Sequence, residues 1–142
     1  MIQRIQTLWL SLTAIVSLLT LKFSFYSGNI ADTSVTPAGK KFIELTGVYF
    51  FPILILTVAI TVISLIVIFL YANRKLQLRL VILTFLISLL NLYLYYAETK
   101  KFIEGNVVLT AVLSFIIPVF LILAARGIYA DEKLIKNADR LR

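Results

Sequence analysis

Four long segments without a single charged residue divide this chain, and they constrain its fold more than any other feature. The charge-free segments are Ile5–Leu21, Leu45–Asn73, Leu80–Ala97 and Gly105–Ala125. The hydrocarbon core of a bilayer is roughly 30 Å thick, and an α-helix of about 20 apolar residues crosses it. Each segment is close to this length or longer, so we expect the chain to cross a membrane four times.

The composition supports an all-α membrane protein built as one four-transmembrane-helix bundle. Of the 142 residues 61% are hydrophobic, and the mean hydropathy is +0.98. Four spans use most of the chain, so little is left for a separate soluble core. We therefore predict a single domain over residues 1–142, with spans at about 5–25, 48–72, 78–97 and 106–128, an outer loop at 26–47 and a C-terminal tail at 129–142.

The residue types that carry most enzyme and metal chemistry are missing. Cysteine and histidine are both absent. This removes the commonest ligands of zinc, haem and iron-sulfur centres and the usual general base near neutral pH. The acidic residues of the loops stand singly, as Asp32, Glu44, Glu98 and Glu104 do. We therefore expect no enzymatic activity, no cofactor and no metal.

The basic residues predict the orientation, since Lys and Arg near the ends of spans tend to stay in the cytoplasm. One side of the predicted bundle carries nine of them: Arg4, Arg74, Lys75, Arg79, Arg126, Lys133, Lys136, Arg140 and Arg142. The other side carries five, namely Lys22, Lys40, Lys41, Lys100 and Lys101. Both termini are therefore expected in the cytoplasm, and the net charge of +7 indicates contact with lipid head groups rather than nucleic acid.

A positive residue followed by an apolar run also describes a secretory signal peptide. The exit of the first span reads Lys22-Phe23-Ser24-Phe25-Tyr26 and lacks the small residues of a cleavage site. The first helix is therefore expected to be retained.

Small polar residues recur at helical spacing inside the spans. The most pronounced stripe is in the third span, where Thr84, Ser88, Asn91 and Tyr95 follow one another at i, i+4, i+7 and i+11. Such stripes usually face neighbouring helices, where hydroxyl and amide groups hydrogen-bond across the interface. A hydrophilic pathway built from the same residues is the alternative, and Pro118 in the fourth span, which is expected to kink that helix, is compatible with either interpretation.

Two segments outside the spans have patterns of their own. In the outer loop, alternating apolar residues flank the turn signal Pro37-Ala38-Gly39, which permits a β-hairpin. The tail from Asp131 to Arg142 predicts a short cytoplasmic amphipathic helix, with Leu134, Ile135, Ala138 and Leu141 on one face. Asp131 is the expected N-cap of that helix.

The two ends of the chain resemble a known family. The opening residues 1–8 (Met-Ile-Gln-Arg-Ile-Gln-Thr-Leu) and the closing groups Ala125-Arg126-Gly127-Ile128, Asp131-Glu132-Lys133-Leu134 and Ala138-Asp139-Arg140-Leu141-Arg142 carry the likeness. They are similar to a family of small four-helix inner-membrane proteins, found mostly in Bacteroidota and catalogued as a domain of unknown function (number 4293). The resemblance implies an integral protein of the cytoplasmic membrane and implies no activity.

The matching polar residues all fall on one side of the predicted bundle, and they are our candidates for partner binding: Gln3, Arg4, Gln6, Arg126, Asp131, Glu132, Asp139 and Arg140. Either they pair with one another and close the bundle, or a partner contacts them. We expect a non-catalytic accessory or structural subunit that binds the lipid bilayer and a larger membrane protein. The alternative is a transporter or channel for a small neutral solute, lined by the stripe around Asn91.

Overall fold

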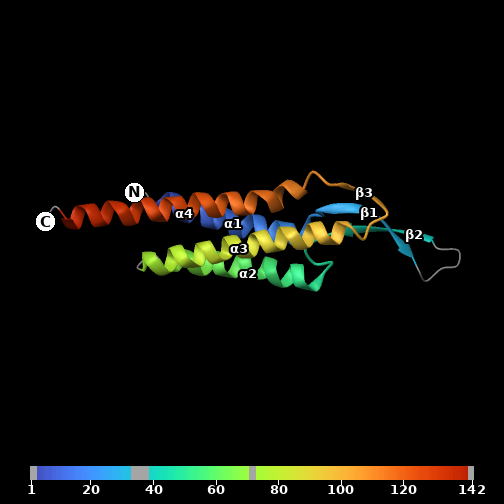
Figure 1. Cartoon of the computed structure of the whole chain (residues 1–142), viewed down its shortest axis with the longest axis horizontal. Helices are drawn as coiled ribbons and strands as arrows, with labels where there is room; N and C mark the ends of the chain where they lie inside the picture. The colour runs from blue at the N-terminus through green and yellow to red at the C-terminus, as the bar shows by residue number, and fades with distance from the viewer. Residues whose placement is uncertain (1–2, 33–38, 71–72, 141–142) are drawn as a thin grey trace.

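The structure is a computed structural model that describes residues 3–32, 39–70 and 73–140. Its elements follow in the order α1 (Gln3–Lys22), β1 (Tyr26–Asp32), β2 (Gly39–Leu45), α2 (Phe51–Phe69), α3 (Arg74–Thr99), β3 (Glu104–Val107) and α4 (Ala111–Arg140). Figure 1 shows four long helices side by side and a small sheet beyond one end of them.

The helices run alternately up and down, so both chain ends and the α2–α3 connection lie at the same end of the bundle (Figure 1). We call this the terminal end and the opposite one the sheet end. The neighbouring helix pairs are α1 with α2, α2 with α3, α3 with α4, and α4 with α1. The helices therefore follow their chain order around the bundle, and the last closes against the first.

All four helices are long and apolar enough to cross a bilayer. Their outward faces carry exposed apolar side chains, such as Leu86 on α3 and Val119 on α4. Water would penalise that exposure, whereas lipid does not. The prediction of a multi-pass membrane protein with four such helices is confirmed.

The buried side chains of each helix recur at alternating spacings of three and four residues. On α3 this pattern takes in seven residues: Gln77, Val81, Thr84, Ser88, Asn91, Tyr95 and Glu98. The same spacing appears in α2 with Ile53, Thr57, Ile60, Ser64 and Val67. This 3.5-residue period keeps one seam of a helix facing its neighbours in a left-handed bundle. On α3 that seam is polar at every position except Val81.

The C-terminal segment differs from the expected separate amphipathic helix. Residues 111–140 form one unbroken helix, α4, and Asp131 lies inside it rather than at an N-cap. The helix continues because Ile128 and Asp131, which follow Gly127, are buried against the bundle. Tertiary contacts therefore offset the low helix propensity of the glycine.

The outer loop contains a pair of antiparallel strands, which the sequence pattern permitted. β1 and β2 are antiparallel with Tyr26 opposite Leu45, while Pro37 and Ala38 lie outside the described residues. A third strand, which the sequence pattern did not predict, comes from the α3–α4 connection. β3 pairs with the other edge of β1, so the strand order is β2-β1-β3.

Glycine allows the close pairing of β1 and β3. Gly28 lies opposite Gly105, and a Cβ on Gly28 would lie 2.3 Å from the carbonyl oxygen of Glu104. The ring of Tyr26 covers Gly105 and meets Phe102 edge-on, with ring centroids 5.1 Å apart. The sheet thereby joins the first and the last helical connections at one end of the bundle.

Candidate functional site

Asp131 is the centre of a polar cluster at the terminal end. Its carboxylate is buried, and it accepts a hydrogen bond of 2.5 Å from the side-chain amide of Gln6 on α1. A guanidinium nitrogen of Arg74, at the start of α3, lies 3.8 Å from the same carboxylate oxygen. A buried carboxylate needs such partners, because its desolvation is otherwise costly. The cluster ties α1, α3 and α4 together.

Gly127 makes room for Gln6 in this cluster. A Cβ at position 127 would lie only 2.9 Å from Cγ of Gln6. The glycine therefore lets the Gln6 side chain pass against α4 and reach Asp131, one helical turn further along. The resemblance group Ala125-Arg126-Gly127-Ile128 thus includes a residue with a packing role.

Nearby, Gln77 links α3 to the end of α2. Its amide nitrogen donates to the backbone carbonyl of Val67 at 3.2 Å. That carbonyl belongs to the last turn of α2, and it also accepts from the backbone amide of Leu70, the C-cap residue of the helix. Together with the Asn73 side chain, which accepts from the amide of Leu76 at the start of α3, this contact secures the α2–α3 corner.

The stripe of α3 faces the inside of the bundle, as the packing interpretation predicted. Thr84, Ser88, Asn91 and Tyr95 are all buried. The Asn91 amide donates to the hydroxyl of Thr57 on α2 at 3.1 Å. The Tyr95 hydroxyl is hydrogen-bonded to the side chains of Thr57 and Thr20, and its ring stacks on Phe25 at 4.7 Å. The polar stripes of three helices therefore meet.

Two hydroxyls of these stripes meet between α1 and α2. Oγ of Ser17 and Oγ1 of Thr61 lie 2.7 Å apart, so one of them donates to the other, and each oxygen also lies within 3.0 Å of a carbonyl oxygen of its own helix. Among the described residues, two buried atoms lack a hydrogen-bond partner: Oγ of Ser64 and Oδ1 of Asn91.

Ion pairs stabilise the sheet end. Glu98, buried at the end of the α3 seam, pairs with Lys101 at 2.7 Å. Lys40 on β2 reaches across β1 to Glu104 on β3 at 2.8 Å, and both side chains are exposed. The Lys40 ammonium holds the pKa of the Glu104 carboxyl below its usual value, through its hydrogen bond and its charge.

A known family matches nearly all of the chain. The model of a domain of unknown function, DUF4293, matches residues 2–141. The chain belongs to this family. No curated protein and no solved structure matched the chain. The DUF4293 match confirms the resemblance found at the two chain ends and extends it over all four helices and the sheet.

The partner-binding candidates of this DUF4293 protein have different environments. Gln6 and Asp131 bind each other, Arg126 is exposed and Glu132 is half-buried. The side chains of Gln3, Arg4, Asp139 and Arg140 lie outside the described part of the structure. The interpretation that the two chain ends close the bundle therefore holds for one pair.

Arg74, Gln77 and Glu98 are among the polar residues in these contacts that were not candidates. The signal for Gln77 and Glu98 was present, because extending the stripe of Thr84 to Tyr95 by the same steps reaches both. Arg74 carried no such signal, since its partner lies more than fifty residues away on α4.

Proposed function

We propose that this DUF4293 protein is a non-catalytic accessory subunit of a larger complex in the cytoplasmic membrane. It would lie with its terminal end in the cytoplasm, as the excess of basic residues there favours. The observation that carries the proposal is the length of α4. This helix has 30 residues and is about 45 Å long, whereas the 19 residues of α2 make about 28 Å.

The extra length projects from the terminal end. Figure 1 shows the last turns of α4 beyond the ends of the other three helices. We call residues 132–140 the α4 extension. Its backbone is helical, and Leu134 is 55% exposed. A helix this short is marginal in isolation. An apolar side chain on a projecting helix is a natural contact for a second protein.

The interior of the bundle supports the same proposal, because its polar groups serve the fold. Asn91, Thr57, Tyr95 and Ser17 bind each other or neighbouring helices. A subunit of this kind needs a stable bundle and an exposed element for docking. The α4 extension supplies the second requirement.

The test is purification of the tagged full chain from its own host at native expression level in mild detergent, followed by mass spectrometry of bound proteins. We expect a stoichiometric membrane partner that is lost with Leu134→Lys. Ile103→Lys is the matched control, since Ile103 is equally exposed but lies at the sheet end. Isolation of the unaltered protein alone would contradict the proposal.

A transporter or channel for a small neutral solute is the second candidate. It is favoured by the polar seam of α3 and by the unpartnered atoms Ser64 Oγ and Asn91 Oδ1. Purified protein in liposomes should then speed glycerol or urea entry, and Asn91→Leu should abolish that effect. Leu90→Ala, on the exposed face of the same helix, is the control. Equal flux for Asn91→Leu and the unaltered protein would reject this candidate.

A further inference from the structure

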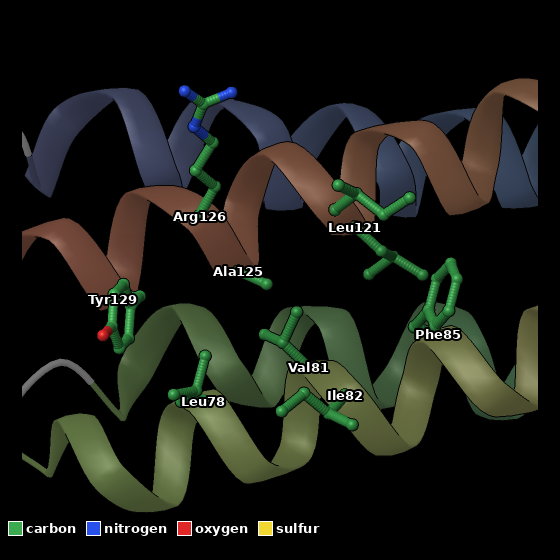
Figure 2. A pocket seen from close by; sticks show the side chains of 9 residues that line it. Leu78, Val81, Ile82, Phe85, Leu121, Ala125, Arg126 and Tyr129 are labelled. Carbon is green, nitrogen blue, oxygen red and sulfur yellow. The ribbon is translucent and has the colours of Figure 1, made fainter.

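An apolar groove lies between α3 and α4 in the half of the bundle nearer the terminal end. Its volume is about 390 Å³, and Val81 and Leu121, both buried, form its floor. Its sides are formed by Leu78, Ile82 and Phe85 of α3 and by Ile122, Ala125 and Tyr129 of α4. Figure 2 shows the side chains of the two helices pointing toward one another, with the short side chain of Ala125 between larger neighbours.

The groove opens toward lipid. Ile82, Ile122 and Tyr129 are each about half exposed or more, and they lie on membrane-spanning helices. Nearly all of the lining surface is apolar. Such a surface suits a hydrocarbon chain and offers little to a polar solute.

The length of the groove suits one acyl chain. The groove runs from Leu121 to Tyr129, eight residues or about 12 Å of helix, close to the thickness of one leaflet of the hydrocarbon core.

Basic residues border the groove on the side of the terminal end. On α4, Arg126 follows Ile122 by four residues, and Lys133 follows Tyr129 by four, so these positions share one helical face. On α3, Lys75 and Arg79 precede Leu78 and Ile82 by three residues each. All four basic side chains are exposed, and Arg126 also forms part of the groove wall.

These four basic residues outnumber the two nearby acids. Asp131 is turned inward to Gln6, and Glu132 is half-buried. Figure 2 shows the Arg126 guanidinium on the outer side of α4, directed away from the α3 side chains that line the groove. An anionic phosphate at that level would gain charge-assisted hydrogen bonds, and each basic residue near the membrane surface contributes about 1 kcal/mol to such attraction.

We propose that the α3–α4 groove is a binding site for an anionic phospholipid. One acyl chain lies between Ala125 and Ile82, and the phosphate lies among Arg126, Lys133, Lys75 and Arg79. This proposal does not depend on the accessory-subunit function, because it concerns the membrane-embedded surface and not the α4 extension.

The test uses the full chain in phosphatidylcholine vesicles that contain a small fraction of phosphatidylglycerol with a diazirine on its acyl chain. After illumination, peptide mass spectrometry locates the label. We expect it on the groove residues of α3 and α4, and we expect unlabelled phosphatidylglycerol to displace it far better than phosphatidylcholine does.

Two kinds of variant test separately the binding of the acyl chain in the groove and the attraction of the phosphate by the basic residues. Ala125→Phe fills the groove and should remove its label, whereas Val119→Phe, an equally bulky change on the exposed part of α4, should not. Arg126→Gln and Lys133→Gln should each lower groove labelling about five-fold, the ratio that about 1 kcal/mol corresponds to. Lys22→Gln at the sheet end should leave it unchanged.

Three results would overturn the proposal. One is equal labelling of the exposed faces of all four helices, with equal displacement by both lipids. Another is full groove labelling in the two charge variants, whose altered side chains are exposed and do not support the fold. A third is efficient cross-linking of a photoreactive residue at Ala125 to another protein in native membranes, which would assign the groove to a protein partner.

Discussion

The side-chain amide of Gln6, near the start of the first helix, donates a 2.5 Å hydrogen bond to the buried carboxylate of Asp131, 125 residues later on the fourth helix. This contact closes the ring of helices at the terminal end, and Arg74 adds a positive charge 3.8 Å from the same oxygen. Asp131 would otherwise be a buried and unpaired carboxylate in a helix interior. The bundle therefore depends on a pairing between residues from the two ends of the sequence.

Removing the acceptor should destabilise the bundle. Asp131→Leu leaves the buried Gln6 amide without its partner, and we expect a loss of about 2 kcal/mol in the free energy of unfolding. Asp131→Asn keeps a carbonyl oxygen that can accept, so it should cost less than about 1 kcal/mol. The fluorescence of Trp9, the single tryptophan, reports unfolding in a denaturing detergent titration. Glu44→Gln, at an exposed carboxylate, is the control, and equal stability of Asp131→Leu and this control would contradict the cluster's role.

The packing of Gly127 against Gln6 predicts that Gly127→Ala does not give the gain in stability that this substitution gives in most helices. In an ordinary helix, Gly→Ala stabilises by up to about 1 kcal/mol. Here the new Cβ lies 2.9 Å from Cγ of Gln6, so Gly127→Ala should give no gain or a loss. In a Gln6→Ala background the obstruction is gone, and the same substitution should stabilise. A double-mutant cycle measured by detergent unfolding gives the coupling, and additive effects would show that the two residues do not compete for space.

The contact between Asn91 and Thr57 should contribute modestly to stability. Hydrogen bonds between membrane helices average about 0.6 kcal/mol and reach about 1.7 kcal/mol. We expect a coupling energy in this range for the cycle of Asn91→Leu and Thr57→Val, because the two side chains are 3.1 Å apart. Leu90→Ala with Thr57→Val is the matched cycle and should show no coupling, since Leu90 is on the exposed face of α3.

The Lys40–Glu104 pair predicts a pH dependence of the sheet. Lys40 lowers the pKa of Glu104 in the folded state, so its contribution to stability is present above the ordinary glutamate pKa and is lost as the pH falls through the lowered value. Lys40→Met should raise the Glu104 pKa toward its ordinary value, as measured by NMR titration of the carboxyl carbon. Because both side chains are exposed, high salt should have the same effect as the substitution.

Lys41→Met is the control for that titration. Lys41 pairs with Ile30 across β1, one position from Lys40, so its side chain lies on the opposite face of the sheet. The Glu104 pKa should not respond to this change. An equal response to both substitutions would mean that general charge, and not the contact with Lys40, sets the pKa.

The sequence by itself determined the four membrane-spanning helices and the inward direction of their polar stripes. Both follow from local pattern: backbone groups in lipid need partners within their own helix, and a 3.5-residue repeat gathers Thr84, Ser88, Asn91 and Tyr95 on one face. The alternating residues around the turn signal at Gly39 permitted a hairpin, and the structure has the β1–β2 pair there.

Only the tertiary structure decided the ring order of the helices, the pairing of Gln6 with Asp131, the third strand and the groove beside Ala125. Each of these depends on which distant segments meet, and an apolar helix face fits lipid and a neighbouring helix equally well. The unbroken α4 is the clearest case, because burial of Ile128 and Asp131 against the bundle carries the helix through Gly127, where local propensity favours an end.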